Sequence, residues 1–196
     1  MSRIYLASRS PRRAELLQQI GIEARILPSE IDESVYNAEG ASEYVQRLAA
    51  EKAAAGAALL LEVDLPVLAA DTTVCVDGRI LGKPESDEDA YGMLKLMSGR
   101  WHEVYTAIAV LSPLGLELAL SATSVKMAEL PDTLIAEYVA TGEPRDKAGA
   151  YGIQGLGGTL IERIEGSYSG VMGLPLFETA RLLRNAGIAI PAVRNK

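Results

Sequence analysis

The spacing of apolar positions along the chain predicts both strands and helices. Runs typical of strands fall at residues 3–7, 23–27, 67–76, 79–81, 104–111, 118–127 and 160–164. Apolar residues three or four apart, together with capping residues, predict helices at 11–20, 42–61, 87–97, 132–141 and 175–185. We expect a loop at residues 166–170 and a loose tail after Pro191. The run VLAADTTVCV, residues 67–76, is the most strand-like and predicts a buried central strand.

The sequence LASRSPRR near the N-terminus joins the first strand to the first helix. The strand should stop at Ser8, Ser10 suits the N-cap, and Pro11 suits the first helical position because its missing N–H costs nothing there. Arg12 and Arg13 then fall in the first turn, where the helix dipole disfavours each cation by roughly 0.3–1 kcal/mol. Free N–H groups, the serine hydroxyls and both guanidiniums together indicate a site for a multiply charged anion such as a phosphate chain. The alternative is a solvated pair of surface arginines.

Asp71 lies in the middle of the predicted central strand. A bare carboxylate among apolar neighbours is costly, so we expect it to be paired, hydrogen-bonded, bound to a metal, or placed where the strand opens onto a cleft. Asp77 and Gly78 predict a hairpin turn that carries Lys83 back along the same strand. This allows a contact between Lys83 and Asp71, either as a structural salt bridge or as part of a functional site.

Lys52 lies on the apolar side of the helix predicted at residues 42–61, for which Ser42 is the expected cap. The apolar stripe of that helix consists of Val45, Leu48, Ala49, Ala53 and Gly56. Because Lys52 follows Leu48 by four residues, its side chain should point toward the core side. Either the stem packs while the ammonium escapes to water at the edge, or the ammonium reaches into a cleft and meets an anion.

A glycine-rich segment, DKAGAYGIQGLGG, spans residues 146–158. It predicts a loop whose backbone passes close to another group, because glycine allows such an approach. The segment matches neither the phosphate-binding loop of nucleotide triphosphatases nor the dinucleotide-binding glycine pattern. Gln154 within it can both donate and accept hydrogen bonds, which suits recognition of the edge of a base.

Composition limits the kinds of site that the chain can form. Its 196 residues, 48% of them hydrophobic, suffice for a sizeable core in a single domain, residues 1–196, or in two closely joined lobes. Cys75 is the only cysteine and His102 the only histidine, which excludes an intrachain disulfide, a cysteine-rich zinc site and a histidine metal cluster. Any metal would have carboxylate ligands, which suit Mg²⁺ or Mn²⁺. We expect His102 to be a packed or surface residue and not a catalytic one.

Charge and hydropathy indicate which binding partners and which cellular location to expect. The formal net charge of −7 opposes sequence-independent binding to nucleic acid polymers, so positive charge for an anion site must be local. No apolar run reaches the roughly 18 residues that a membrane span requires. The N-terminus also lacks the basic and then apolar pattern of a signal peptide. We therefore expect a cytoplasmic protein without membrane attachment.

Five motifs, in the same order, resemble those of the Maf family of nucleoside triphosphate pyrophosphatases. They are SRSPRR, AADT, GKP, DKAGAYGIQG and GSYSGVMGLPL, and the match extends from residue 6 to about residue 176. The resemblance implies an α/β fold of the Maf/ITPase-like type, with a mixed central β-sheet flanked by helices and two lobes around a substrate cleft. It also implies a homodimer and the metal-dependent hydrolysis of a nucleoside triphosphate to the monophosphate and pyrophosphate.

The resemblance further implies roles for single residues. Asp71 matches the catalytic aspartate, which would act as general base and metal ligand, with Glu33 as a second candidate ligand for Mg²⁺ or Mn²⁺. Arg12, Thr72 and Gln154 match positions linked to substrate choice. Phosphate binding is expected from Ser8, Arg13, Lys52 and Lys83, and from Ser10 through the anion site described above.

Two positions resemble the branch of the family that acts on dTTP and UTP. Thr72 and Gln154 agree with this branch, whereas the branch acting on 7-methyl-GTP differs at the threonine and carries an acid in place of the glutamine. An amide can complement the adjacent carbonyl and N–H of a pyrimidine such as uracil. Two alternatives stay open: a pyrophosphatase for modified or non-standard nucleotides, and a nucleotide-binding regulator of septum formation with little turnover.

Overall fold

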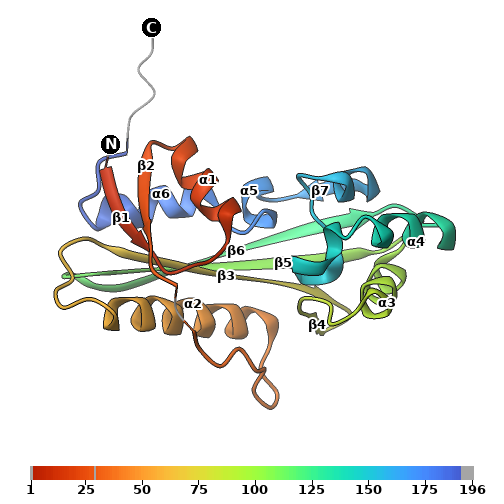
Figure 1. Ribbon diagram of the computed structural model, residues 1–196, viewed down its shortest axis with the longest axis horizontal. Helices are drawn as coiled ribbons and strands as arrows, with labels where there is room; N and C mark the ends of the chain where they lie inside the picture. Colours follow the sequence, from red (N-terminus) through yellow and green to blue (C-terminus); the bar gives the residue numbers. More distant parts are fainter. Residues whose placement is uncertain (1, 29, 191–196) are drawn as a thin grey trace, which may run out of the picture.

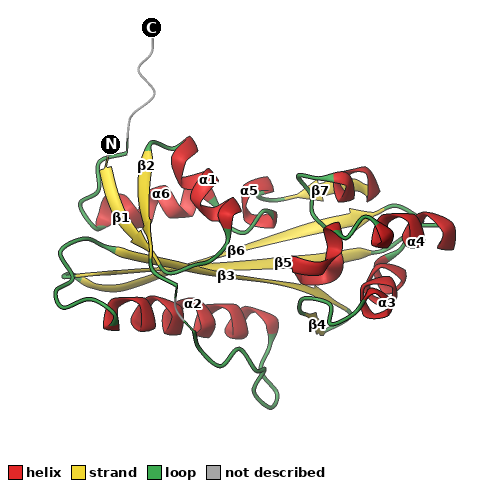
Figure 2. Ribbon diagram, in the orientation of Figure 1, coloured by secondary structure: helices red, strands yellow, loops and turns green. Residues whose placement is uncertain are grey.

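The computed structural model describes residues 2–28 and 30–190. Within these ranges a seven-stranded mixed sheet runs through the molecule, with helices on both faces (Figures 1 and 2). The strands are β1 (Ser2–Leu6), β2 (Ile22–Ile26), β3 (Val67–Val76), β4 (Arg79–Leu81), β5 (Trp101–Ser112), β6 (Gly115–Met127) and β7 (Ile161–Glu165). The helices are α1 (Pro11–Gln19), α2 (Ala41–Ala58), α3 (Asp87–Met97), α4 (Asp132–Ala140), α5 (Tyr168–Val171) and α6 (Leu176–Asn185). Short 3₁₀ turns lie at Glu143–Asp146, Ala148–Ala150 and Leu156–Leu160.

The order of strands in the sheet is β2-β1-β3-β5-β6-β7, and β4 pairs with the last part of β3. Strand β1 is parallel to both β2 and β3, while the other pairs are antiparallel. Strands β5 and β6 form a long hairpin that extends across most of the molecule (Figure 1). The expected α/β fold with a mixed central sheet is therefore confirmed.

Helix α2 covers one face of the sheet, and α1 and α6 cover the other (Figure 1). On the α2 side the strands present small buried residues such as Ala69. Gly56 of α2 lies so close to the sheet that a Cβ atom there would be 2.7 Å from the Cβ of Ala7. On the other side, Leu16 of α1 and Leu183 of α6 are fully buried against the strands. Each face of the sheet therefore carries buried apolar side chains that pack against the helix or helices covering it.

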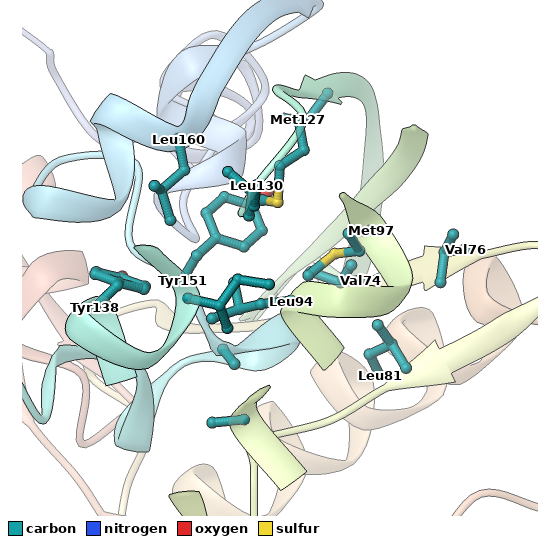
Figure 3. Packing of buried hydrophobic residues seen from close by; sticks show 14 of the residues in the cluster. Val74, Val76, Leu81, Leu94, Met97, Met127, Leu130, Tyr138, Tyr151 and Leu160 are labelled. Atoms are coloured by element: carbon teal, nitrogen blue, oxygen red, sulfur yellow. The ribbon is translucent and has the colours of Figure 1, made fainter. Parts of the chain in front are cut away.

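A separate apolar cluster lies at the other end of the long strands and includes residues of β4, α3 and α4; Figure 3 shows its side chains. Its labelled side chains include Val74, Leu94, Met97, Met127, Leu130, Tyr138, Tyr151 and Leu160. This cluster gives the molecule a second lobe, which β3, β5 and β6 connect to the first. The expected two-lobed architecture is confirmed.

Helices α2 and α3 differ in how well their starts follow from the sequence. Helix α3 has the predicted bounds, and the Oγ of Ser86 accepts a hydrogen bond from the Asp89 N–H at 3.1 Å, as the capping pattern predicts. Helix α2 instead begins before Ser42, because the Tyr44 N–H donates to the carbonyl of Gly40 at 2.9 Å and closes the first turn earlier. It ends at Ala58, where i to i+3 hydrogen bonds tighten the last turn.

Residues 166–170, expected to be a loop, contain part of the short helix α5. The Oγ of Ser167 accepts a hydrogen bond from the Gly170 N–H at 3.0 Å and caps this turn. The glycines around it hide this signal in the sequence. The tail expected after Pro191 lies outside the described residues. Among the helices described, none has the length and apolar character needed to cross a membrane.

Candidate active site

The candidate site lies at a split in the sheet. Strand β1 pairs with β3 only as far as Leu68, and β4 joins β3 at Val74. Between them, residues 69–73 of β3 have β5 on one side and, within the described chain, no strand on the other. The chain leaves β1 through α1 on one face and, after β2, returns to β3 through α2 on the other (Figure 1). In open α/β sheets, such a reversal places a crevice beyond the end of the strand.

A pocket of about 510 Å³ occupies this crevice. This volume lies in the range typical of sites for small molecules. The start of α1, the α2 helix, β3 and the glycine-rich segment all contribute to its lining. Each residue expected to form the site lines this one pocket: Ser8, Ser10, Arg12, Arg13, Glu33, Lys52, Asp71, Thr72, Lys83 and Gln154.

Asp71 and Thr72 face opposite sides of the sheet because successive strand residues alternate. Asp71 has the same orientation as Val67 and Ala69, which pack under α2, and it meets Lys52 of that helix. Thr72 is turned toward the other face, where it meets Arg13 of α1. Asp71 and Thr72 therefore contact one cation from each helical layer, Lys52 and Arg13 respectively. Both contacts lie where the sheet is split.

The Lys52 ammonium lies between two carboxylates. Its Nζ is 2.6 Å from Oδ1 of Asp71 and 2.8 Å from Oε1 of Glu33. The Lys52 side chain is only 12% exposed and ends inside the pocket, which excludes the alternative in which its ammonium escapes to water. Burial raises the pKa of Asp71, and the charge of Lys52 offsets only part of that rise. Asp71 is thus a desolvated carboxylate held by one lysine.

Lys83 does not supply the ion pair of Asp71 that the hairpin allowed. Among the described residues, the lysine that pairs with Asp71 is Lys52. Strand β4 ends at Leu81, and the carbonyl of Gly82 accepts a hydrogen bond from the Gly149 N–H at 3.0 Å. The chain after β4 is therefore bonded to the glycine-rich segment. Lys83 lines the pocket from that side.

Arg13 is a buried guanidinium that donates to neutral acceptors. Its Nε, Nη1 and Nη2 donate to the carbonyl of Gly173, the Oγ of Ser8 and the Oγ1 of Thr72, at 2.8, 3.1 and 3.2 Å. Burial lowers the pKa of Arg13, and the nearby charge of Asp71 opposes this shift. Since these three acceptors carry no charge, they orient the guanidinium without forming an ion pair with it. Such a group at the wall of a pocket suits the binding of an anion.

The Thr72 hydroxyl is part of a chain of hydrogen bonds that holds Arg13. Its Oγ1 lies 3.0 Å from Oγ1 of Thr106, whose own hydroxyl donates to the carbonyl of Gly170 at 2.8 Å. Because the Thr106 proton is used in that bond, Thr72 must donate to Thr106 and accept from Arg13. The hydroxyl of Thr72 therefore fixes where the Arg13 guanidinium lies.

Arg12 differs from Arg13 in its partner. Its Nη1 lies 3.1 Å from Oδ2 of Asp146, at the start of the glycine-rich segment. Burial raises the pKa of Asp146, but contacts with Lys147 and Arg12 lower it overall, so the carboxylate stays charged. The Arg12–Asp146 pair joins the start of α1 to the second lobe across the pocket.

Ser8 and Ser10 shape the turn between β1 and α1. The Oγ of Ser8 accepts hydrogen bonds from the Ser10 N–H and from Arg13, both at 3.1 Å. Ser10 occupies the N-cap position as expected, but its side chain makes no capping hydrogen bond. The first turn of α1 therefore keeps N–H groups that this side chain does not satisfy, and these groups border the pocket.

The residues that line the pocket and that sequence reasoning missed include three with polar side chains near the charged groups: Tyr44, Asp146 and Lys147. The Tyr44 hydroxyl donates to the main-chain carbonyl of Glu33 at 2.9 Å, which positions the acidic loop. No pattern in the sequence distinguishes this tyrosine. Asp146 and Lys147 open the motif DKAGAYGIQG, so their place in that motif was an available signal.

Asp71 and Glu33 are two carboxylates of the pocket that could hold a hard divalent cation. Asp71 and Glu33 approach the same Lys52 ammonium, so both carboxylates lie within reach of one cation. In the described part of the chain, no group of three or more His, Cys, Asp or Glu side chains could hold a metal. Mg²⁺ characteristically takes one or two carboxylates and completes its shell with water and substrate phosphates, and the pair fits that pattern.

His102 is a packed residue, as expected. It is 2% exposed, and its Nε2 lies 2.7 Å from the hydroxyl of Tyr151. Burial lowers the pKa of His102 to about 4, so the ring is neutral near neutral pH. Its role is therefore in the packing of the second lobe.

Comparison with known proteins gives matches along almost the whole chain. The family model described as Maf-like protein matches residues 3–186. A dTTP/UTP pyrophosphatase of Methylobacillus flagellatus is 73% identical over 195 residues, which cover 100% of this chain and 98% of that protein. A dTTP/UTP pyrophosphatase of Bordetella parapertussis is 53% identical over 196 residues, covering 96% and 95% of the two chains.

Two further similarities are more distant. A nucleoside triphosphate pyrophosphatase of Haemophilus ducreyi is 47% identical over 191 residues, covering 96% of this chain and 97% of that protein. Among solved structures, that of the Staphylococcus aureus Ham1 protein matches with a TM-score of 0.48 and 17% identity, over 65% of this chain and 72% of that one. This last likeness is partial and says nothing about activity.

Proposed function

Because the chain belongs to the family of Maf-like proteins, we propose that it is a nucleoside triphosphate pyrophosphatase that hydrolyses dTTP and UTP to the nucleoside monophosphate and pyrophosphate. One observation carries this proposal. The buried carboxylate of Asp71 opens, beside Lys52, into a pocket whose wall also holds Arg12, Arg13 and Lys83. This combination of one acid and several cations suits cleavage of a phosphoanhydride.

In the proposed reaction, water attacks the α-phosphorus and the bond to the bridging oxygen of the β-phosphate breaks. Asp71 accepts the proton of the attacking water at its carboxylate. Arg13, Lys52 and Lys83 neutralise the charge that builds up on the phosphates and on the departing pyrophosphate. A divalent cation, held by Asp71 with Glu33 directly or through water, would supply further charge neutralisation.

Substrate choice is proposed for three residues that lie apart in the sequence. The Gln154 amide can pair with the adjacent carbonyl and N–H of uracil or thymine. Arg12 is held beside the glycine-rich segment by Asp146, and Gln154 of the same segment lines the pocket with it. Thr72 contributes through its hold on Arg13, which sets where the phosphate chain sits relative to the base.

The test is a pyrophosphate-release assay with dTTP, UTP, CTP, 7-methyl-GTP and modified pyrimidine triphosphates, in Mg²⁺ or Mn²⁺. We expect the highest kcat/KM for dTTP and UTP. Asp71→Asn should lower kcat by orders of magnitude. The matched control is Asp64→Asn, because Asp64 is exposed and accepts a hydrogen bond from Tyr5 that asparagine can also accept.

Other outcomes of the assay would favour other functions. A clear preference for modified nucleotides would mean that these, and not dTTP and UTP, are the substrates. The enzyme would then have a housekeeping role in removing them. Tight binding of UTP without release of pyrophosphate would favour a regulatory protein. We further propose that the chain forms a single domain and acts as a cytoplasmic homodimer, and light scattering after gel filtration would test the homodimer.

A further inference from the structure

Glu143, in the 3₁₀ turn after α4, binds the backbone of the glycine-rich segment. Its Oε2 accepts a hydrogen bond from the Leu156 N–H at 2.9 Å, and its Oε1 accepts one from the Gly157 N–H at 2.9 Å. The hydroxyl of Tyr138 also donates to Oε1, at 2.8 Å. Three donors therefore converge on one carboxylate, although Glu143 itself is not among the residues that line the pocket.

Two glycines of this segment are needed because the backbone passes close to the side chains of Glu143 and Lys147. A Cβ atom at Gly155 would lie 2.7 Å from the Cδ of Glu143. A Cβ atom at Gly152 would lie 2.6 Å from the Cε of Lys147, whose Nζ donates to the main-chain carbonyl of Glu143. The groups that the glycine-rich backbone approaches, left unidentified by the sequence, thus include the Glu143 carboxylate at Gly155, the Lys147 side chain at Gly152 and the Val74 side chain at Gly149.

These contacts hold the chain on both sides of Gln154. Before it, the Gly152 N–H donates to the Tyr138 hydroxyl at 3.2 Å. After it, the Leu156 and Gly157 N–H groups donate to Glu143, which also accepts from Tyr138. Burial raises the pKa of Glu143, but the hydrogen bonds from Gly157 and Leu156 lower it overall, so the Glu143 carboxylate stays ionised at neutral pH.

We propose that Glu143 is a positioning residue for base recognition, which fixes the glycine-rich backbone so that Gln154 meets uracil or thymine in preference to cytosine. The proposal rests on the proposed function, because it assigns Gln154 to the base. An amide can discriminate between two bases only if its oxygen and nitrogen are held in one place. A loop of four glycines between residues 152 and 158 has no such rigidity by itself, and Glu143 supplies it.

The decisive variant is Glu143→Gln. A glutamine has the same length, but its NH₂ group can only donate, so it faces a backbone N–H without an acceptor. We would measure dissociation constants of UTP, CTP and inorganic tripolyphosphate by calorimetry, in the Asp71→Asn background so that no substrate is consumed. We expect the preference for UTP over CTP to fall about tenfold, as expected for loss of one positioned hydrogen bond. The affinity for tripolyphosphate should change less than about twofold.

The control is Glu137→Gln, because Glu137 is exposed on α4, one residue before Tyr138. This variant should leave all three dissociation constants unchanged. The proposal is overturned if Glu143→Gln keeps the full preference for UTP. It is also overturned if tripolyphosphate binding weakens as much as UTP binding, since that would indicate general damage to the pocket.

A milder variant, Tyr138→Phe, keeps the proposal testable if the Glu143→Gln protein does not fold. It removes one donor to Glu143 and the acceptor of the Gly152 N–H, and it keeps the buried ring. We expect a smaller loss of UTP preference and faster amide exchange at Leu156 and Gly157, and unchanged values of both would contradict the proposal. If the unaltered protein releases no pyrophosphate, the proposed function fails, while these binding ratios still decide the role of Glu143.

Discussion

The Lys52 ammonium lies 2.6 Å from the carboxylate of Asp71, and the two side chains are 12% and 10% exposed. This is a short ion pair between a helix and a strand, at the point where the sheet is split. Removing one member of such a pair leaves the other as a buried, uncompensated charge. The pKa of Asp71 should therefore depend on Lys52.

The first prediction concerns the pH dependence of activity. If Asp71 acts as a base, activity is lost as the pH falls through its pKa, which burial raises above the ordinary value. Lys52→Met removes the largest influence that lowers this pKa, so the acid limb of kcat/KM should move to higher pH. The limb should stay nearer its original position in Lys52→Arg, which keeps the charge. An acid limb that is the same in all three proteins would remove Asp71 from the role of base.

A second prediction concerns Thr72 and Arg13. Thr72→Val removes the acceptor of Arg13 Nη2 and leaves a buried N–H without a partner, at a cost of about 1–3 kcal/mol. We expect weaker binding of the triphosphate, by about tenfold in KM for UTP, whereas Thr72→Ser should stay close to the original protein. Titration with inorganic tripolyphosphate checks the cause. If Thr72→Val leaves tripolyphosphate binding intact, the hydroxyl does not act through Arg13.

A third prediction concerns Gln154. Replacing it with glutamate removes the donors of the amide and adds a negative charge, so pyrimidine triphosphates should lose kcat/KM selectively. The substrate panel measures this directly, with 7-methyl-GTP as the comparison. An equal loss with every base would mean that Gln154 does not read the base.

A fourth prediction concerns the glycine-rich segment. Gly155→Ala would bring its Cβ atom to 2.7 Å from the Cδ of Glu143, a carboxyl that three hydrogen bonds keep from moving aside. Stability should fall, and urea unfolding would measure the loss. In a double-mutant cycle with Glu143→Ala, the second change should relieve part of the clash. Strictly additive effects would show that the two residues do not interact.

The fifth prediction concerns stability below neutral pH. The pKa of His102 is lowered from 6.5 in the unfolded chain to about 4 in the folded protein, so the unfolded chain binds the proton first. This group is without effect above pH 6.5 and destabilises the fold progressively as the pH falls from 6.5 toward 4. Between about pH 8 and about pH 5 we expect a loss of about 2 kcal/mol in the free energy of unfolding. His102→Gln should lack this part of the loss, and identical pH profiles would contradict the assignment.

Elements with strong local signals were predictable from the sequence. The run at residues 67–76 is β3, because an apolar run rich in β-branched residues and followed by a turn signal favours a buried strand. Ser86 and Asp89 mark the start of α3 by a contact within one turn. At the start of α2 the predicted cap was Ser42, but Gly40 occupies the N-cap position. The helix therefore begins earlier than predicted, at Ala41.

The candidate site residues were also proposed from the sequence, most of them through the motifs that carry them, and all of them line one pocket in the structure. Their pairing did not follow. Both Lys52 and Lys83 were candidates for an anionic partner, and only the packing of α2 on the strand face that holds Asp71 selected Lys52. Glu143, in contrast, carries no signal of its own, since its partners are backbone N–H groups.

The amino-acid sequence by itself determined where most of the strands and helices lie and which charged and glycine residues are available for chemistry, because those depend on patterns within a few neighbouring positions. Only the tertiary structure decided which cation meets which acid, where the sheet splits, and what the glycine-rich backbone encloses. These depend on contacts between residues far apart in the chain, such as Lys52 with Asp71 and Arg12 with Asp146. Such distances are set by how the layers pack, and no local pattern encodes them.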